Sequence, residues 1–285
     1  MIVNTSALLC YSKLSINIKF IKFTIVKDII KFGRYIIGHS LIVIFKNQYD
    51  NMMVAKFLTT GFLGLYSWAF TIATIPVQML VCILNSVMYP IYCKMQDKDE
   101  MLKLLYQTWK IVLVIVLPVM IILFCYTRSI VFLAAGEKWL PMCLTLKILC
   151  VYSSIRCFLA VLGPVFTAIG KPNIIFYIGT LTLIIGVALV PIFIIKIGMP
   201  GAAIAITVTM LLDFILVMVA LTKEFPKAWI HNKKLYPIIL VNLSVFIFFI
   251  IINFLLKPNL LFQILIVLIG FTFYGWLIYK IENEK

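Results

Sequence analysis

The sequence predicts an all-α integral membrane protein with about eight transmembrane helices. Hydrophobic residues make up 64% of the 285 positions and charged residues only 12%, and the mean hydropathy of +1.13 lies outside the range of soluble globular domains. Uncharged runs long enough to cross about 30 Å of hydrocarbon recur along the chain. These runs are apolar on every helical face, whereas strands of a membrane barrel alternate polar and apolar residues in segments of about ten. The spans are therefore expected to be helices.

Turn-forming residues separate the expected spans. Glycine and proline lie together at 170–172 and again at 198–201, in each case between two apolar runs. The charged segment 94–110 places Met101, Leu105 and Trp109 on one helical face, which predicts a short interfacial helix before the third span. The spans are expected at residues 33–57, 62–90, 108–127, 140–169, 173–196, 200–222, 235–256 and 259–280.

The positive charges predict how the chain is oriented in the membrane. The net charge of +15 comes from basic residues that punctuate the apolar runs and do not gather in one domain, so nucleic acid is not an expected partner. With eight spans, most lysines and arginines fall on the side that holds both chain ends. Because positive loops are retained in the cytoplasm, we expect a multi-pass protein of the cytoplasmic (inner) membrane with both termini inside. The opposite side holds only Lys56, Arg128, Lys138, Lys196 and Lys257.

Three regions follow from this reading. Residues 1–31 contain a short apolar stretch that cannot span a bilayer and lacks the basic start and small-residue cleavage site of a signal peptide, so we expect a cytoplasmic approach segment. Residues 32–222 form a six-helix transmembrane lobe. Residues 223–285 form a cytoplasmic loop and two additional transmembrane helices.

Neither a metal site nor a cofactor is expected. None of the 7 cysteines belongs to a C-x-x-C pair, and most lie inside apolar spans, where they act as small packing residues. His39 and His231 are far apart in the sequence and have no ligand pattern nearby. Both are interpreted as structural or interfacial.

A series of short motifs resembles the second half of Wzx-type polysaccharide flippases, which belong to the multidrug/oligosaccharidyl-lipid/polysaccharide exporter superfamily. The order and spacing of these motifs over about 190 residues carry the resemblance, and the similarity is greatest to the colanic-acid-exporter branch. The motifs are Phe32-Gly33-Arg34, Asp50 to Leu58, Gly61 to Ala69, Pro76-Val77-Gln78, Tyr89 to Asp97, Gly136 to Pro141, Ala168 to Pro172 and Gly198 to Ala205.

The resemblance implies a fold and a function. Members of this family have two six-helix lobes around a central cavity, and this chain is expected to begin in the loop that leads into the second lobe. The implied activity is export, or flipping, of a lipid-linked polysaccharide repeat unit for lipopolysaccharide or other cell-surface polysaccharide biosynthesis. The implied partners are an undecaprenyl-pyrophosphate-linked oligosaccharide, the lipid bilayer, and either a separate first lobe or a second copy of the chain.

Arg156 is the first candidate for substrate binding. It lies well inside the span 140–169, one turn beyond Tyr152 and Ser153, where a charge costs roughly 2.5–3.5 kcal/mol on insertion scales. The guanidinium matches phosphate oxygens, so it could anchor the pyrophosphate; the alternative is a structural pair with an aspartate of a neighbouring helix. Lys147, nine residues earlier, is half a turn out of phase with Arg156, so the two are not expected to line one cavity.

A polar cluster in the first expected span supplies further candidates. Lys46 and Asp50 have i, i+4 spacing and are expected to pair on one helical face. In the transport reading Asn47, Asp50 and Asn51, together with Tyr66, face the sugar, and Asp50 is also a candidate for ion coupling. The alternative is a self-satisfied cluster near the external interface.

Asp213 is a carboxylate near the middle of the expected span 200–222. It is either a second ion-coupling acid or the partner of Arg156 or Lys147.

Three other function classes are alternatives to a flippase. A drug antiporter of the same superfamily would couple transport through membrane carboxylates, of which only Asp50 and Asp213 are available. An enzyme is not expected, because a polymerase needs a large external loop and an acyltransferase needs a histidine with an acid nearby. A non-functional or partner-dependent fragment of a flippase is the third alternative.

Overall fold

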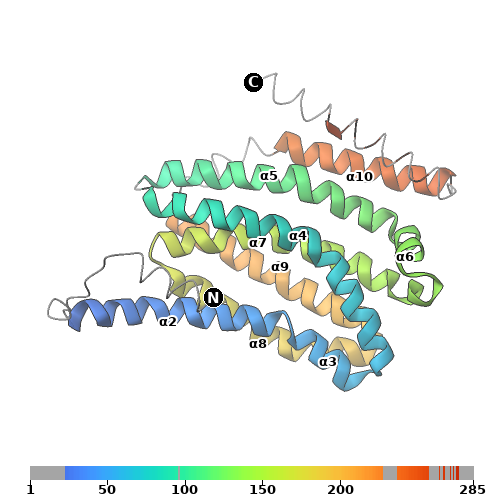
Figure 1. The fold of residues 1–285 in the computed structure, drawn as a ribbon, viewed down its shortest axis with the longest axis horizontal. Coiled ribbons are helices and arrows are strands. Elements are labelled where there is room, and N and C mark those ends of the chain that lie inside the picture. Colours follow the sequence, from blue (N-terminus) through green and yellow to red (C-terminus); the bar gives the residue numbers. More distant parts are fainter. Residues whose placement is uncertain are drawn as a thin grey trace, which may run out of the picture.

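The computed structural model describes residues 23–95, 97–226 and 236–256, and isolated positions between 263 and 275. Within these residues every regular element is a helix, as the sequence predicts (Figure 1). In chain order the elements are α2 (Phe23–Lys46), α3 (Tyr49–Phe57), α4 (Thr60–Lys94), α5 (Lys98–Cys125), α6 (Thr127–Ala135), the 3-10 helix η2 (Glu137–Met142), α7 (Cys143–Ala168), α8 (Pro172–Ile197), α9 (Met199–Glu224) and α10 (Tyr236–Leu256).

Five helical segments of the described chain are long and apolar enough to cross a membrane. They are α4, α5, η2 continued by α7, α8 and α9, and they coincide with the spans expected from 62–90 through 200–222. α10 lies at the span expected for 235–256. The span expected at 259–280 falls almost entirely outside the described residues, as do residues 1–22 of the approach segment 1–31. Residues 23–31 of that segment belong to α2, which therefore starts before the expected span 33–57.

The first expected span, 33–57, is broken in the structure. The last turn of α2 tightens, because the backbone N–H groups of Asn47 and Gln48 donate to carbonyl oxygens three residues earlier, at 3.2 and 3.1 Å. α3 then starts at Tyr49. The prediction of one continuous helix was therefore wrong, and the break leaves Lys46 and Asp50 on separate helices.

The connections also differ from expectation. The described part of segment 94–110 contains no separate interfacial helix: α5 begins at Lys98, where the Asp97 side chain accepts a hydrogen bond from the Asp99 N–H at 2.9 Å. The expected apolar stripe exists, but Met101, Leu105 and Trp109 are buried in the core and do not lie on a membrane surface. The connection between the spans expected at 108–127 and 140–169 contains α6 and η2, joined at Gly136 with a φ of 85°.

α7 is the central helix of the lobe. It packs against α4, α5 and α9, while α9 packs against α8 (Figure 1). α2 and α3 lie along α8, and α10 lies on the outer side of α5. Among the described helices, α2 packs along α8 and has little contact with α4. α2 and α4 therefore diverge on one side of α7.

Glycines on α8 allow the α2–α3 pair to approach closely. A Cβ at Gly186 would lie 2.6 Å from the Tyr49 hydroxyl, and one at Gly179 would lie 3.4 Å from Ile42. No larger residue fits at Gly186 without moving Tyr49. This packing fixes the end of α2 next to α8 and α9, where the polar residues of α2 are found.

Candidate functional site

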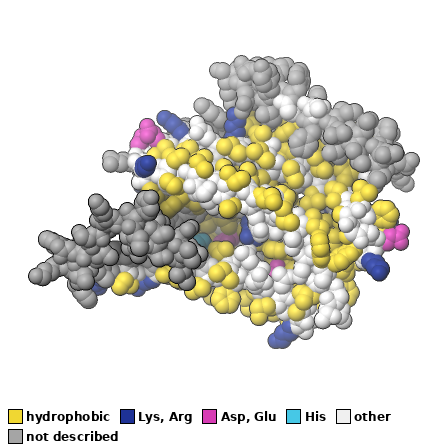
Figure 2. Space-filling model, in the orientation of Figure 1, with side chains coloured by type: hydrophobic (Ala, Val, Ile, Leu, Met, Phe, Trp, Pro, Cys, Tyr) yellow, Lys and Arg dark blue, Asp and Glu magenta, His cyan; other side chains and the backbone are white. Residues whose placement is uncertain are grey.

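A cavity of about 400 Å³ lies between α2, α4, α7, α8 and α9. Figure 2 shows this hollow in a face that is otherwise largely hydrophobic, with basic, acidic and histidine side chains inside it. Its lining is largely apolar but includes charged and amide side chains, which are unfavourable in lipid unless they have a ligand, water or a partner to contact, so the cavity is the leading candidate for a binding site. Its polar lining consists of His39, Lys46, Asn47, Gln78, Asn85, Tyr152, Arg156, Thr167 and Asp213.

Arg156 projects from α7 into this cavity, as the transport reading expects. Its Nη1 lies 3.5 Å from the Tyr152 hydroxyl, and its guanidinium lies 6.0 Å from the centre of the Tyr152 ring. Among the described residues no carboxylate forms an ion pair with Arg156. The structural pair that was the alternative interpretation is therefore not found in this part of the chain, and the guanidinium keeps donors for an anion.

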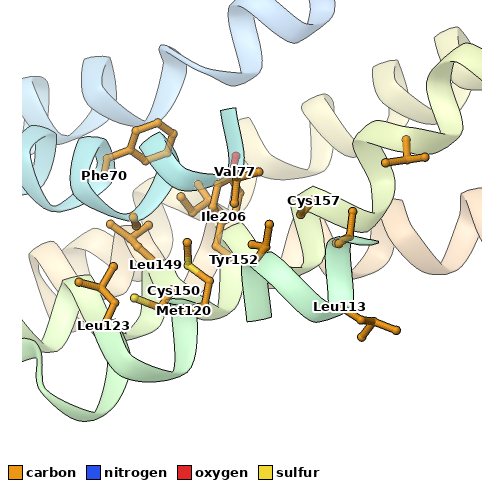
Figure 3. Close-up of a cluster of buried hydrophobic side chains, with 14 of the residues drawn as sticks. Phe70, Val77, Leu113, Met120, Leu123, Leu149, Cys150, Tyr152, Cys157 and Ile206 are labelled. Atoms are coloured by element: carbon orange, nitrogen blue, oxygen red, sulfur yellow. The ribbon is translucent and has the colours of Figure 1, made fainter. Parts of the chain in front are cut away.

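Tyr152 holds a fixed position beside Arg156. Figure 3 shows it among buried apolar side chains of several helices, including Phe70, Val77 and Ile206. The rings of Tyr152 and Phe70 have centroids 5.8 Å apart. Such packing restricts the Tyr152 side chain, so the tyrosine limits the directions in which Arg156 can point.

Lys147 does not line the cavity. Its Nζ lies 5.7 Å from the centre of the Phe124 ring, on another side of α7. The helical spacing that separates Lys147 from Arg156 is therefore confirmed.

Asp213 is paired with a residue that the sequence reasoning did not assign to it. The Lys46 Nζ lies 2.7 Å from Asp213 Oδ2 and donates to Thr182 Oγ1 at 2.6 Å, and Thr182 in turn donates to Asp213 Oδ1 at 3.1 Å. The expected pairs of Asp213 with Arg156 or Lys147, and of Lys46 with Asp50, are all wrong. The break after Lys46 directs this side chain towards α8 and α9 instead of along its own helix.

Asp50 belongs to a different buried cluster. Its Oδ2 accepts a hydrogen bond from the Tyr66 hydroxyl at 2.8 Å, and its Oδ1 accepts one from the Asn51 N–H at 2.9 Å. The Asn51 side chain accepts a hydrogen bond from Ser67 at 3.0 Å. None of Asp50, Asn51 and Tyr66 lines the cavity, so of the predicted sugar-facing group only Asn47 does. The other three join α3 to α4.

Gln78 and Asn85 are among the polar cavity residues that the sequence did not indicate, as are His39 and Thr167. Gln78 and Asn85 both project from α4 into the cavity, and the Asn85 amide is 3.5 Å from the Ala160 carbonyl oxygen of α7. They are seven residues apart, which is close to two helical turns and places them on one face. That spacing is the signal that could have revealed them. No cluster of three or more potential metal ligands occurs within the described residues.

The fold and the cavity define a multi-pass α-helical membrane protein with charged and amide side chains in a cavity between its helices. Residues 1–144, half of the chain, match the family described as "Polysaccharide biosynthesis protein". The chain therefore belongs to this family of polysaccharide biosynthesis proteins. The match starts at residue 1, so it includes the segment 1–31 that was set apart from the lobe.

Relatives with similar sequences come from three bacteria. The chain is 29% identical over 128 residues to lipopolysaccharide biosynthesis protein WzxC of Escherichia coli, and 27% identical over 153 residues to teichuronic acid biosynthesis protein TuaB of Bacillus subtilis. It is 25% identical over 192 residues to an uncharacterized membrane protein in the cps region of Klebsiella pneumoniae. The matched segments cover 45%, 53% and 67% of this chain but 26%, 32% and 40% of the relatives. The similarity therefore extends over less than half of each relative.

Proposed function

We propose that this chain takes part in export of lipid-linked polysaccharide repeat units, by flipping them from the inner to the outer leaflet of the cytoplasmic membrane. The observation that carries the proposal is Arg156, a guanidinium without a carboxylate partner in the described residues, inside a cavity of a membrane-spanning lobe. A charge so placed is costly unless it has a function or a partner. The family membership supports polysaccharide as the cargo.

In this proposal Arg156 binds the pyrophosphate of an undecaprenyl-pyrophosphate-linked oligosaccharide. A guanidinium can donate two parallel hydrogen bonds to phosphate oxygens, and Tyr152 holds it in place. The amides of Asn47, Gln78 and Asn85 line the same cavity and offer donors and acceptors suited to sugar hydroxyls. The chemistry required is binding and release, so we assign transport and no enzymatic reaction.

The cavity also requires a cover. It opens where α2 and α4 diverge, and polar groups facing hydrocarbon there would be unfavourable. A further helical lobe, or a second copy of this chain, would close it and complete a passage.

We place both termini in the cytoplasm on the basis of the lysine and arginine distribution. Asp50 and Asp213 stay candidates for ion coupling.

Ligand binding by the purified protein in lipid nanodiscs tests this proposal. We expect undecaprenyl pyrophosphate to raise the thermal denaturation midpoint, because a ligand that binds only the folded state stabilises it. Undecaprenol, which has the same chain and no charge, should raise it far less. Arg156→Gln should remove the difference between the two lipids, and the matched control Lys147→Gln should keep it. Equal stabilisation by undecaprenol, or an unchanged response of Arg156→Gln, would contradict the assignment of Arg156.

A further inference from the structure

An ion pair forms part of the wall of the cavity that contains Arg156. Lys46 at the end of α2 contacts Asp213 of α9 at 2.7 Å and Thr182 of α8 at 2.6 Å, so three helices contribute to one small polar unit. The side chains of Lys46 and Asp213 are only 19% and 9% exposed. Because ammonium and carboxylate carry opposite unit charges, the pair adds no net charge to the cavity.

Tyr152 connects this pair to Arg156. It lines the main cavity and also borders a smaller pocket formed with Lys46, Thr182 and Asp213. Its hydroxyl lies 3.5 Å from the Arg156 guanidinium. A change in the charge of either partner of the pair would therefore alter the field on any ligand that Arg156 binds. Asp50, the other carboxylate on this side of the lobe, does not line the cavity, and both its oxygens accept hydrogen bonds.

We propose that Lys46 determines the charge selectivity of the cavity. Among the residues that line the cavity, its ammonium offsets the Asp213 carboxylate and leaves Arg156 as the net positive charge, so the cavity accepts anions with phosphate or carboxylate oxygens. The inference rests on the proposed role of Arg156 as the anion anchor and adds the residues that set the sign of the field around it. Asp213 alone would oppose anion binding, and Lys46 alone would add to it.

The expected size of the effect follows from Coulomb's law. A unit charge about 10 Å from a bound anion, in a medium of effective dielectric constant near 20, changes the dissociation constant by roughly tenfold. The effect is screened little because both partners are largely buried. Hydrogen bonding at the pair can be altered separately from its charge, since Thr182 contacts the ammonium but is neutral.

The test measures the dissociation constant of inorganic pyrophosphate by titration calorimetry, with protein in neutral-lipid nanodiscs at pH 8 and fixed ionic strength. Asp213→Asn preserves the shape of the side chain and removes its charge, so we expect roughly tenfold tighter binding. A gain in affinity cannot arise from loss of folded protein. Lys46→Met should bind roughly tenfold more weakly, and the double variant Lys46→Met/Asp213→Asn should return to within about twofold of the unaltered protein.

Thr182→Val is the matched control. It removes the hydrogen bonds of Thr182 with the Lys46 ammonium and with the Asp213 carboxylate without changing charge, and its affinity for pyrophosphate should stay unchanged. Unchanged affinity of Asp213→Asn, or the same gain in Thr182→Val, would overturn the role of Lys46. Unchanged affinity of Arg156→Gln would instead refute the anion anchor of the proposed function. Glucuronate, titrated in the same way, represents an acidic sugar. Tighter binding of glucuronate as well as pyrophosphate by Asp213→Asn supports selection by charge. Tighter binding of neither anion overturns it.

Discussion

Residues 1–285, expressed by themselves in a flippase-deficient cell, should fail to restore surface polysaccharide, and co-expression with a matching first lobe should restore part of it. The reason is the opening between α2 and α4, where no described residue closes the cavity that contains Arg156 and Lys46. A charge left facing hydrocarbon costs roughly 2.5–3.5 kcal/mol on insertion scales, so a lobe without a cover is both unstable and unable to enclose cargo. The measurement is surface polysaccharide per cell, with the amount of membrane-inserted protein determined in parallel.

A second copy of the chain is the other partner that would close the cavity between α2 and α4. In that case export would return without an added lobe, and purified protein would be a dimer in detergent. Complementation by a detergent-stable monomer of residues 1–285 would contradict the need for any cover. A cross-link between cysteines introduced at Gln78 of two copies would distinguish the dimer from the monomer, because Gln78 lies on the face of α4 that borders the opening.

In a strain where the chain supports export, Arg156→Ala should reduce surface polysaccharide by more than about tenfold, because loss of a charge-assisted bidentate contact costs on the order of 1.5–3 kcal/mol. Lys147→Ala should leave export within about twofold, since Lys147 lies beside Phe124 outside the cavity. Arg156→Lys keeps the charge but loses the planar fork of donors, so intermediate export is expected.

The amount of folded protein separates binding from stability in this comparison. All three variants should reach similar levels in the membrane, because Arg156 forms no ion pair within the described chain and its removal leaves no buried carboxylate unpaired. Comparable export losses for Arg156→Ala and Lys147→Ala, or a matching loss of folded protein, would indicate a structural role for Arg156 in place of the proposed one.

The sequence contained most of the information about where the helices lie. Spans from α4 to α9 follow from uncharged runs interrupted by glycine and proline, because the bilayer demands about 20 apolar residues per crossing. That Arg156 and Lys147 lie on different sides of α7 followed from the helical period alone. Both features depend on local sequence, which is why they could be predicted.

The polar contacts could not be predicted in the same way. Lys46 and Asp50 would lie on one helical face only if a single helix continued through both residues. The tightened turn at Asn47 and Gln48 interrupts that helix. The actual partner, Asp213, is 167 residues away, and nothing in the local sequence specifies which helices are neighbours. Asp50 and Tyr66 were assigned to the cavity because polar groups in membrane helices often face one, whereas here the two side chains satisfy each other between α3 and α4.

The free thiols of the lobe supply an intrinsic chemical reporter of its orientation. Cys93 is exposed and lies next to Lys94 at the end of α4, while Cys150 and Cys157 are buried between helices. A membrane-impermeant maleimide should therefore reach Cys93 only from the cytoplasm in a variant whose other exposed thiol, Cys82, and whose Cys10 are replaced by serine. Cysteines introduced at Lys98 and at Lys138 should react from opposite sides, and the reverse pattern would invert the proposed topology. Because the buried thiols are protected, loss of that protection during labelling would also reveal partial unfolding of α7 in the same experiment.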